Sequence, residues 1–334
     1  MGIITRFKSG IASASGTTGS VGLGITSALI AWFCFSLNDV GIKFLSGDYA
    51  LHQIVLVRSS VGLFLTLAVI MPLEGGYGLV RTKHLGLHLL RGFCVVLANM
   101  LFFVGLASIS LPEATSLFFV APLFITALSV VFLGEKVGWY RWFAISVGLL
   151  GVVVMLRPGS DAFRLAALLP VSAAFAYACL QILTRKIGFS DRASTMSFYI
   201  QLVFILVCVP FGLLFGDGRF ANPDNASIDF LFRAWTLPDF RDGLIMLGLG
   251  FGTALGGYLI SQAYRVCEAV VIAPFEYIAL ILSIFWGVMI WNEWPDLVAW
   301  IGILLILGSG LLVFWREVVR QRLVAIRHPM PRNR

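Results

Sequence analysis

Four ionisable residues, Asp39, Lys43, Arg58 and Glu276, lie inside segments that are otherwise apolar. A charge in hydrocarbon costs roughly 2.5–3.5 kcal/mol on insertion scales, so such residues usually line a cavity or a polar pathway. Asp39 and Lys43 are four residues apart and therefore share one helix face. Asp39 could take up a proton or meet a substrate amine, and Lys43 could meet a carboxylate. The alternative is that the two residues pair with each other, with Lys43 reaching outward.

Arg58 and Glu276 extend this prediction to two further segments. The Arg58 guanidinium keeps its charge and needs an anion, which could be Asp39 or a substrate. Glu276 is the lone charge between Val270 and Trp291. Pro274, just before it, would interrupt the helix and free backbone groups beside a cavity. A buried carboxyl group there could exchange protons, unless an interior partner holds it in a structural role.

Other polar residues in the apolar segments are weaker candidates for the same site. Asn38 and Tyr277 adjoin Asp39 and Glu276 and could contact a substrate, although polar residues in such positions equally often join helices. Arg91 opens the third apolar segment, where it could hold an inner gate or a lipid headgroup.

Three glutamates are interpreted as structural residues that cap the starts of helices. Ser110 and Glu113 have the spacing of a capping box. Glu135 and Glu293 each close an apolar segment, and we expect each to cap the helix that follows.

Composition excludes a soluble fold, because 59% of the residues are hydrophobic and only 12% are charged, whereas soluble domains carry about 25% charged residues. The sequence predicts an all-α integral membrane protein, since only helices satisfy the backbone of such segments in lipid. Ten spans are expected, near 22–45, 50–72, 86–108, 112–133, 139–156, 165–187, 194–216, 241–264, 269–291 and 296–315.

The positive charges indicate how these spans are oriented. The net charge is +7, but no basic face interleaved with aromatic residues points to nucleic acid. With the N-terminus in the cytoplasm, cytoplasmic segments hold 17 Lys and Arg residues and the opposite side holds 5. This bias predicts that both termini are cytoplasmic, which requires an even number of spans.

Motifs for enzyme chemistry are missing from the sequence. There is no His-Glu-x-x-His, no pair of intramembrane aspartates and no phosphate-binding Gly-x-x-x-x-Gly-Lys. The cysteines are not paired at metal-ligand spacing. We therefore expect no enzyme activity, no cofactor and no metal.

The two halves of the chain resemble each other. Residues 131–136 read Val-Phe-Leu-Gly-Glu-Lys and residues 289–294 read Met-Ile-Trp-Asn-Glu-Trp, and a Gly-rich apolar segment follows each. Because five spans per half is an odd number, the second half must be inverted relative to the first. The predicted organisation is a tail at 1–21, repeats at 22–158 and 159–315, and a basic tail at 316–334.

These motifs resemble the drug/metabolite transporter superfamily, in its ten-helix EamA branch. The stretches that carry the resemblance are "NDVGIKFL" at 38–45, "LVRSSVGL" at 56–63, "HLLRGF" at 88–93, the run from 111 to 159 and "APFEYIALILSIFWGVMIWNEWPD" at 273–296. Within that branch the chain looks most like bacterial transporters that take up riboflavin or S-adenosylmethionine. The segment 216–240 is longer than this group leads us to expect.

The resemblance implies a secondary transporter of a small polar organic metabolite in a bacterial inner membrane, working by alternating access between two inverted halves. An exporter of amino acids or related metabolites is the alternative. Rivals of other classes are a membrane scaffold or anchor protein, which would not need interior charges, and a passive channel. Expected partners are a small-molecule substrate and lipid, with no nucleic acid. Close glycine spacings at 148–151 and 302–310 predict tight helix packing, in a monomer or a homodimer.

Overall fold

The computed structural model describes the backbone of residues 2–74, 76–82, 84–134, 138–158, 165–187, 193–266 and 272–327. Side chains are described between Gly22 and Leu312, except at those gaps and at a few further helix positions. Every regular element in these ranges is helical, as the apolar sequence predicts.

The elements divide into long apolar helices and short connecting ones. The long helices are α1 (Gly2–Leu45), α2 (Leu51–Leu65), α4 (Leu85–Leu106), α6 (Ala121–Leu133), α7 (Trp139–Leu156), α8 (Leu168–Ile187), α9 (Ala193–Phe215), α11 (Phe240–Val266), α13 (Ile278–Trp291) and α14 (Leu297–Arg327). The short elements are η1 (Thr66–Ile70), α3 (Met71–Glu74), η2 (Tyr77–Val80), α5 (Leu111–Phe118), η3 (Leu165–Ala167), α10 (Ala226–Phe232) and η4 (Ala273–Tyr277).

Seven helical stretches of the described chain are long and apolar enough to cross a membrane: Gly22–Leu45, Leu51–Ile70, Leu85–Leu106, Leu111–Phe132, Leu165–Leu183, Ser194–Phe215 and Phe240–Ile260. Three more, Trp142–Leu156, Phe275–Trp291 and Leu297–Leu312, are apolar but shorter. Each of these ten stretches overlaps one of the expected segments, and seven of them meet the length of a membrane span.

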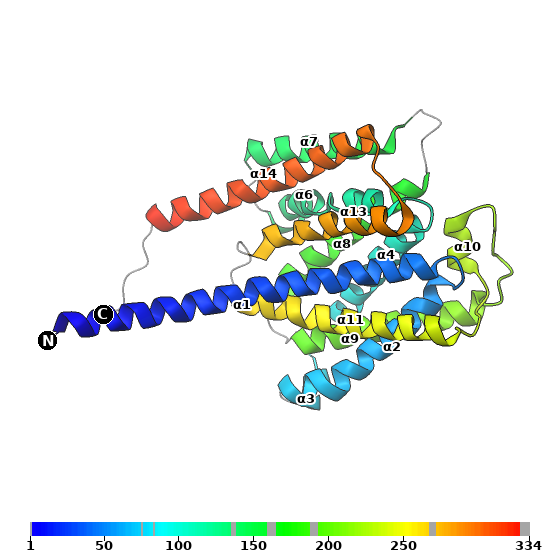
Figure 1. The fold of residues 1–334 in the computed structure, drawn as a ribbon, viewed down its shortest axis with the longest axis horizontal. Coiled ribbons are helices and arrows are strands. Elements are labelled where there is room, and N and C mark those ends of the chain that lie inside the picture. The colour runs from blue at the N-terminus through cyan, green and yellow to red at the C-terminus, as the bar shows by residue number, and fades with distance from the viewer. Residues whose placement is uncertain are drawn as a thin grey trace.

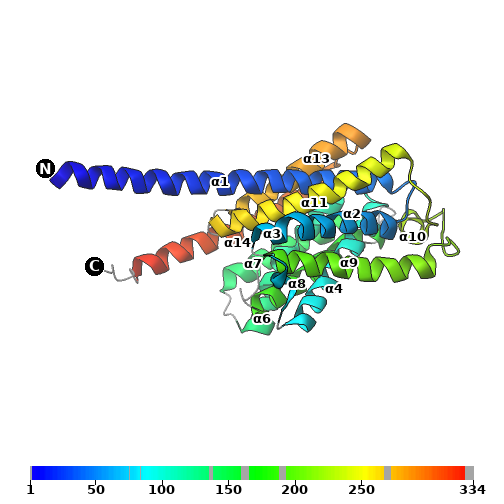
Figure 2. The ribbon, with the colours of Figure 1, turned by 90° about the horizontal axis from the view of Figure 1, so that it is seen from below.

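The helices form one bundle whose two ends differ (Figures 1 and 2). The N-terminal part of α1 and the C-terminal part of α14 project from the same end. The short helix α10 lies at the opposite end. Helix α1 packs on α11 and α13, α4 packs on α8 and α9, α2 packs on α9 and α11, α6 packs on α8, and α7 packs on α14.

Glycines bring α7 and α14 into close contact. A Cβ atom on Gly151 would lie 3.0 Å from the carbonyl oxygen of Gly302, and one on Gly302 would lie 3.1 Å from the carbonyl oxygen of Gly151. Gly148 faces Leu123 and Ser309 in the same way. The tight packing predicted from these spacings therefore occurs within the chain at Gly148, Gly151 and Gly302, whereas Gly308 has no neighbour within 4 Å.

The stretch from 111 to 132 is not one continuous helix. Helix α5 ends at Phe118, and α6 begins at Ala121 with Pro122 in its first turn. The ring of Phe119, between them, stacks on Tyr277 with 5.4 Å between ring centroids. Tyr277 ends η4, so both interruptions meet in the bundle. The Ser110 Oγ accepts a hydrogen bond from the Glu113 backbone N–H at 3.3 Å, which is half of the predicted capping box.

The long segment between α9 and α11 is folded against the bundle. Asn225 caps α10 by accepting a hydrogen bond from the Ile228 N–H at 3.2 Å. Gln53 donates to the carbonyl oxygen of Thr236 at 2.5 Å and accepts from the Thr236 N–H at 3.4 Å. Arg233 donates to the carbonyl oxygen of Ser46 at 2.9 Å. The segment therefore covers the end of the bundle opposite the tails.

Candidate functional site

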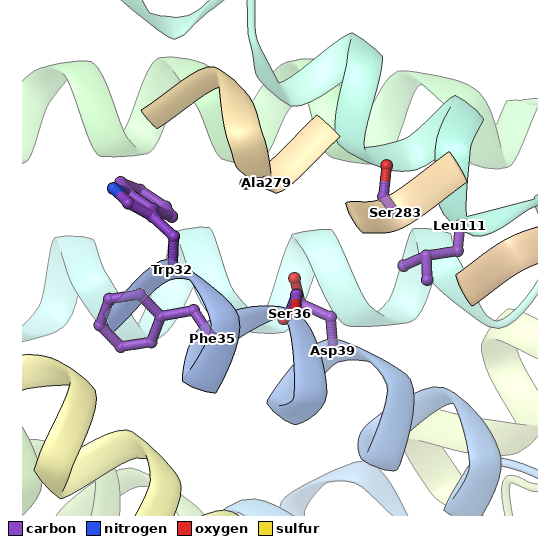
Figure 3. A pocket seen from close by; sticks show the side chains of 7 residues that line it. All are labelled: Trp32, Phe35, Ser36, Asp39, Leu111, Ala279 and Ser283. Carbon is purple, nitrogen blue, oxygen red and sulfur yellow. The ribbon is translucent and has the colours of Figure 1, made fainter. Parts of the chain in front are cut away.

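A small cavity lies between α1 and α13 (Figure 3). Its volume is about 30 Å³, enough for a water molecule or two. Helix α1 forms one wall, α13 forms the facing wall and α5 contributes a residue at one end. The lining residues are Trp32, Phe35, Ser36, Asp39, Leu111, Ala279 and Ser283.

Asp39 is the charged residue in this lining, as expected from its place in an apolar segment. Its Oδ1 accepts a hydrogen bond from Asn38 Nδ2 at 3.2 Å. Beside it, Ser36 Oγ accepts a hydrogen bond from Trp286 Nε1 at 3.3 Å and donates to the carbonyl oxygen of Phe33 at 2.8 Å. The cavity lining thus combines a carboxyl group and two serines, each of which donates to a carbonyl oxygen of its own helix, with the aromatic side chains of Trp32 and Phe35.

Arg58 lies behind this wall and does not line the cavity. It is only 5% exposed. Its Nη1 donates to Asn38 Oδ1 at 3.1 Å and its Nη2 donates to Asn99 Oδ1 at 2.8 Å. Its guanidinium also lies over the rings of Phe103 and Phe204. Sequence reasoning expected a carboxylate or a substrate as its hydrogen-bond partner, and the structure places two amides there, with Asp39 in electrostatic range.

The result is a relay of side chains from three helices. Arg58 on α2 holds the carbonyl group of Asn38 on α1 and of Asn99 on α4, and the amide group of Asn38 donates to Asp39. Because Asn38 accepts from Arg58 through its oxygen and donates through its nitrogen, its amide orientation is fixed. We infer that Arg58 orients Asp39 through Asn38.

Lys43 pairs with a glutamate from the other half of the chain. Its Nζ lies 2.5 Å from Glu293 Oε1, donates to the carbonyl oxygen of Ile109 at 3.3 Å and sits 4.9 Å from the centre of a Trp291 ring. In this conformation Lys43 therefore pairs with Glu293, just beyond the end of α13, and not with Asp39. Asp39 faces the cavity, one turn deeper.

Glu293 caps a different helix from the one expected. Its Oε2 accepts a hydrogen bond from the backbone N–H of Leu111, in the first turn of α5, at 3.0 Å. The helix that follows Glu293 is capped by Asp296, which accepts from the Ala299 N–H at 2.8 Å. The reason is the turn after α13: Asn292 has a φ of 55°, and the Glu293 N–H bonds back to the carbonyl oxygen of Gly287.

Glu276 and Tyr277, two other candidates, lie in η4 outside the cavity lining. Glu276 is half-buried and lies in electrostatic range of Tyr177 and Tyr277. The hydroxyl group of Tyr277 packs against Gly310 of α14. Glu276 therefore does not line the cavity, although η4 packs on α1 and Ala279, three residues after Glu276, is part of the lining.

Arg91 and Glu113 are the remaining candidates whose side chains the structure describes. Half-buried Arg91 lies in α4 within electrostatic range of Tyr177. Half-buried Glu113 lies within electrostatic range of Lys43 and Arg157. Glu135 and the side chain of Pro274 are outside the described residues, although the backbone at 273–277 is a 3₁₀ helix, in keeping with the predicted interruption.

Sequence reasoning missed the aromatic part of the cavity. Trp32, Phe35, Ser36 and Asp39 are spaced i, i+3, i+4 and i+7, which is one face of a helix. Extending the face of Asp39 back by two turns would have found Trp32 and Phe35. No group of three or more His, Cys, Asp or Glu residues that could hold a metal occurs in the described part of the chain.

Comparison with protein families gives two matches to the EamA-like transporter family, at residues 22–157 and 164–315. Together they cover most of the chain. A solved crystal structure superposes with a TM-score of 0.59 over 92% of this chain and 99% of its own, at 17% identity. That likeness concerns the fold alone.

Curated relatives align over nearly their whole length. The chain is 32% identical to a riboflavin transporter of Vibrio cholerae over 82% of this chain and 89% of that protein. It is 28% identical to an S-adenosylmethionine uptake transporter of Rickettsia bellii, over 86% and 94%. It is 26% identical to a pseudopaline exporter of Pseudomonas aeruginosa, over 82% and 89%. The chain, a membrane transporter of small molecules and not an enzyme, belongs to the EamA-like transporter family.

Proposed function

We propose that this protein is a secondary transporter of the bacterial inner membrane that takes up a riboflavin-like or S-adenosyl-type metabolite by alternating access. The observation that carries the proposal is the cavity between α1 and α13, with Asp39 in its wall and the Lys43–Glu293 contact above it. The names of the relatives from Vibrio cholerae and Rickettsia bellii support the substrate class.

The proposal includes ten membrane spans in two inverted repeats, residues 22–158 and 159–315. If α1, α2, α4, α6 and α7 correspond in order to α8, α9, α11, α13 and α14, the packing pairs exchange consistently. The α1–α11 contact becomes α8–α4, α2–α11 becomes α9–α4, and α6–α8 becomes α13–α1. The pairs α2–α9 and α7–α14 map onto themselves. This exchange is what two repeats related by a two-fold axis would give.

The proposed orientation puts both termini in the cytoplasm. The tails of α1 and α14 leave the same end of the bundle, and the bias of positive charge favours that end as cytoplasmic. The α10 end then faces outward, and the Lys43–Glu293 contact lies on the outer side of the cavity.

The described conformation has no room for a metabolite in this cavity. Ligand pockets are about 300–1,000 Å³, ten times the volume between α1 and α13 or more. Transport therefore requires these helices to separate. In the open site, Asp39 would bind a proton or a substrate donor group, and Arg58 would hold Asp39 in place through Asn38.

Uptake by purified protein in proteoliposomes tests the proposal. Asp39→Asn should lower the saturable uptake of radiolabelled S-adenosylmethionine or riboflavin at least about tenfold, since it removes a charged contact. Asp296→Asn, at an exposed site, should leave uptake unchanged. Glu276→Gln, measured in parallel, tests the second carboxyl candidate. Normal uptake by Asp39→Asn would refute the site.

Export is the second candidate function, because one relative is named as an exporter. Proteoliposomes loaded with substrate distinguish the two directions. If exchange can be driven from either side, the coupling gradient determines the direction of transport. Strictly outward transport would replace the uptake proposal.

A further inference from the structure

We propose that the seam between α1 and α13 is the outer gate of the transporter, and that the bond of Lys43 to Glu293 is the latch that holds it closed. This inference rests on the proposed function, because it takes the cavity at that seam as the transport site.

The latch is a half-buried contact between the two halves in which the charged groups have several partners. The side chains of Lys43 and Glu293 are only 10% and 24% exposed. Each carboxylate oxygen of Glu293 has its own partner: Oε1 takes Lys43 and Oε2 takes the N–H of Leu111. Charge-assisted bonds of this kind are roughly twice as strong as neutral ones, so this contact can set the balance between a closed and an open outer side.

The latch and the cavity share the same elements. Ser36 and Asp39 of α1 line the cavity and Lys43 follows one turn later, while Ser283 lines it from α13 and Glu293 lies just beyond the end of that helix. Leu111 both lines the cavity and donates its N–H to the latch. A substrate that fills the cavity must therefore push apart the helices that the latch joins.

A second ion pair at the same end provides a matched control. Arg157, at the end of α7, bonds to Asp296, before α14. Those two helices are already held together by the contact of Gly151 with Gly302. We therefore place the Arg157–Asp296 pair on a fixed part of the bundle, and its loss should not open the cavity.

The test measures access to the cavity without any substrate. The full-length chain, with its native cysteines replaced, carries Ser283→Cys as a reporter that an impermeant thiol reagent labels from outside the cell. Lys43→Met should raise the labelling rate at least about tenfold, as loss of one charge-assisted contact predicts. Lys43→Arg should restore slow labelling, and Arg157→Met should leave it unchanged. Equal labelling rates for Lys43→Met and Arg157→Met would overturn the proposal.

A crosslink provides the complementary measurement if Lys43→Met fails to fold. Lys43→Cys with Glu293→Cys, joined by a bifunctional methanethiosulfonate that forms a disulfide with each cysteine, should stop transport until a reductant cleaves those disulfides. Arg157→Cys with Asp296→Cys, joined in the same way, should not. Continued transport by the crosslinked 43–293 protein would refute the gate. Absence of transport before crosslinking would count against the proposed substrate, and the labelling result would still decide the gate.

Discussion

The bonds of Arg58 allow a quantitative test of how a buried charge is held among these helices. The relevant change is Asn99→Leu, which removes the acceptor of Nη2 while keeping the side-chain size. The partner change is Arg58→Met, and the two are combined in a double variant. If the guanidinium is held by Asn99, the two changes must be coupled.

The expected coupling follows from the type of bond. Hydrogen bonds to charged groups are worth about 1.5–3 kcal/mol in soluble proteins, whereas neutral bonds between membrane helices average about 0.6 kcal/mol. Charge assistance roughly doubles a bond, and Arg58 is only 5% exposed. We therefore expect the loss of unfolding free energy in the double variant to be smaller, by about 1–2 kcal/mol, than the sum of the losses in the two single variants.

The free energy of unfolding can be measured by titrating denaturing detergent into mixed micelles and following tryptophan fluorescence. Asn38→Leu provides an internal comparison, because it removes the acceptor of Nη1 at 3.1 Å and should couple to Arg58→Met by a similar amount. Single effects that add to within about 0.5 kcal/mol, as independent sites do, would refute the assigned bonds.

Three further predictions concern the rest of the bundle. Gly151→Leu should destabilise the protein by about 1–3 kcal/mol through overpacking against α14, whereas Gly308→Ala, with nothing within 4 Å, should be tolerated; thermal unfolding in detergent compares them. The bond to Arg157 lowers the pKa of Asp296, so its contribution is present above the unfolded pKa of about 3.9 and is lost as pH falls below it. Because Asp296 is 55% exposed, Asp296→Asn should cost less than about 1 kcal/mol at neutral pH, and the cost should shrink as pH falls toward the lowered folded pKa, in unfolding titrations over that range. Gln53→Leu should loosen the segment 216–240, and faster cleavage there by protease added outside the cell would show it, while an unchanged rate would contradict the tether.

The sequence predicted the elements well because hydrophobic length and helix termination are local properties. The first segment was expected to end at residue 45, where α1 ends, and the interruption before Glu276 followed from Pro274. The break after Phe118 was missed, although Pro122 disfavours helical backbone in the residue before it and was a usable signal.

The site was only partly predictable, because its bonds join residues far apart in the chain. Asp39 was found because it is a charge in an apolar segment. The partners of Arg58 could not be ranked, because Asn99 is one of several polar residues in such segments. Lys43 and Glu293 are 250 residues apart, and no spacing rule relates them. The turn at Asn292, which directs the Glu293 side chain toward α5, likewise could not be predicted from the sequence.

The small size of the space beside Asp39 also bears on how inhibitors and antibodies for this protein should be sought. When the binding-competent state is a minor population, the measured dissociation constant is the intrinsic one divided by that population. Weak affinity in a ligand screen would then reflect the free energy needed to separate α1 from α13. It would not by itself show that the ligand fits the site poorly. An antibody fragment selected to grip the parted helices would tighten every ligand of that state by one common factor.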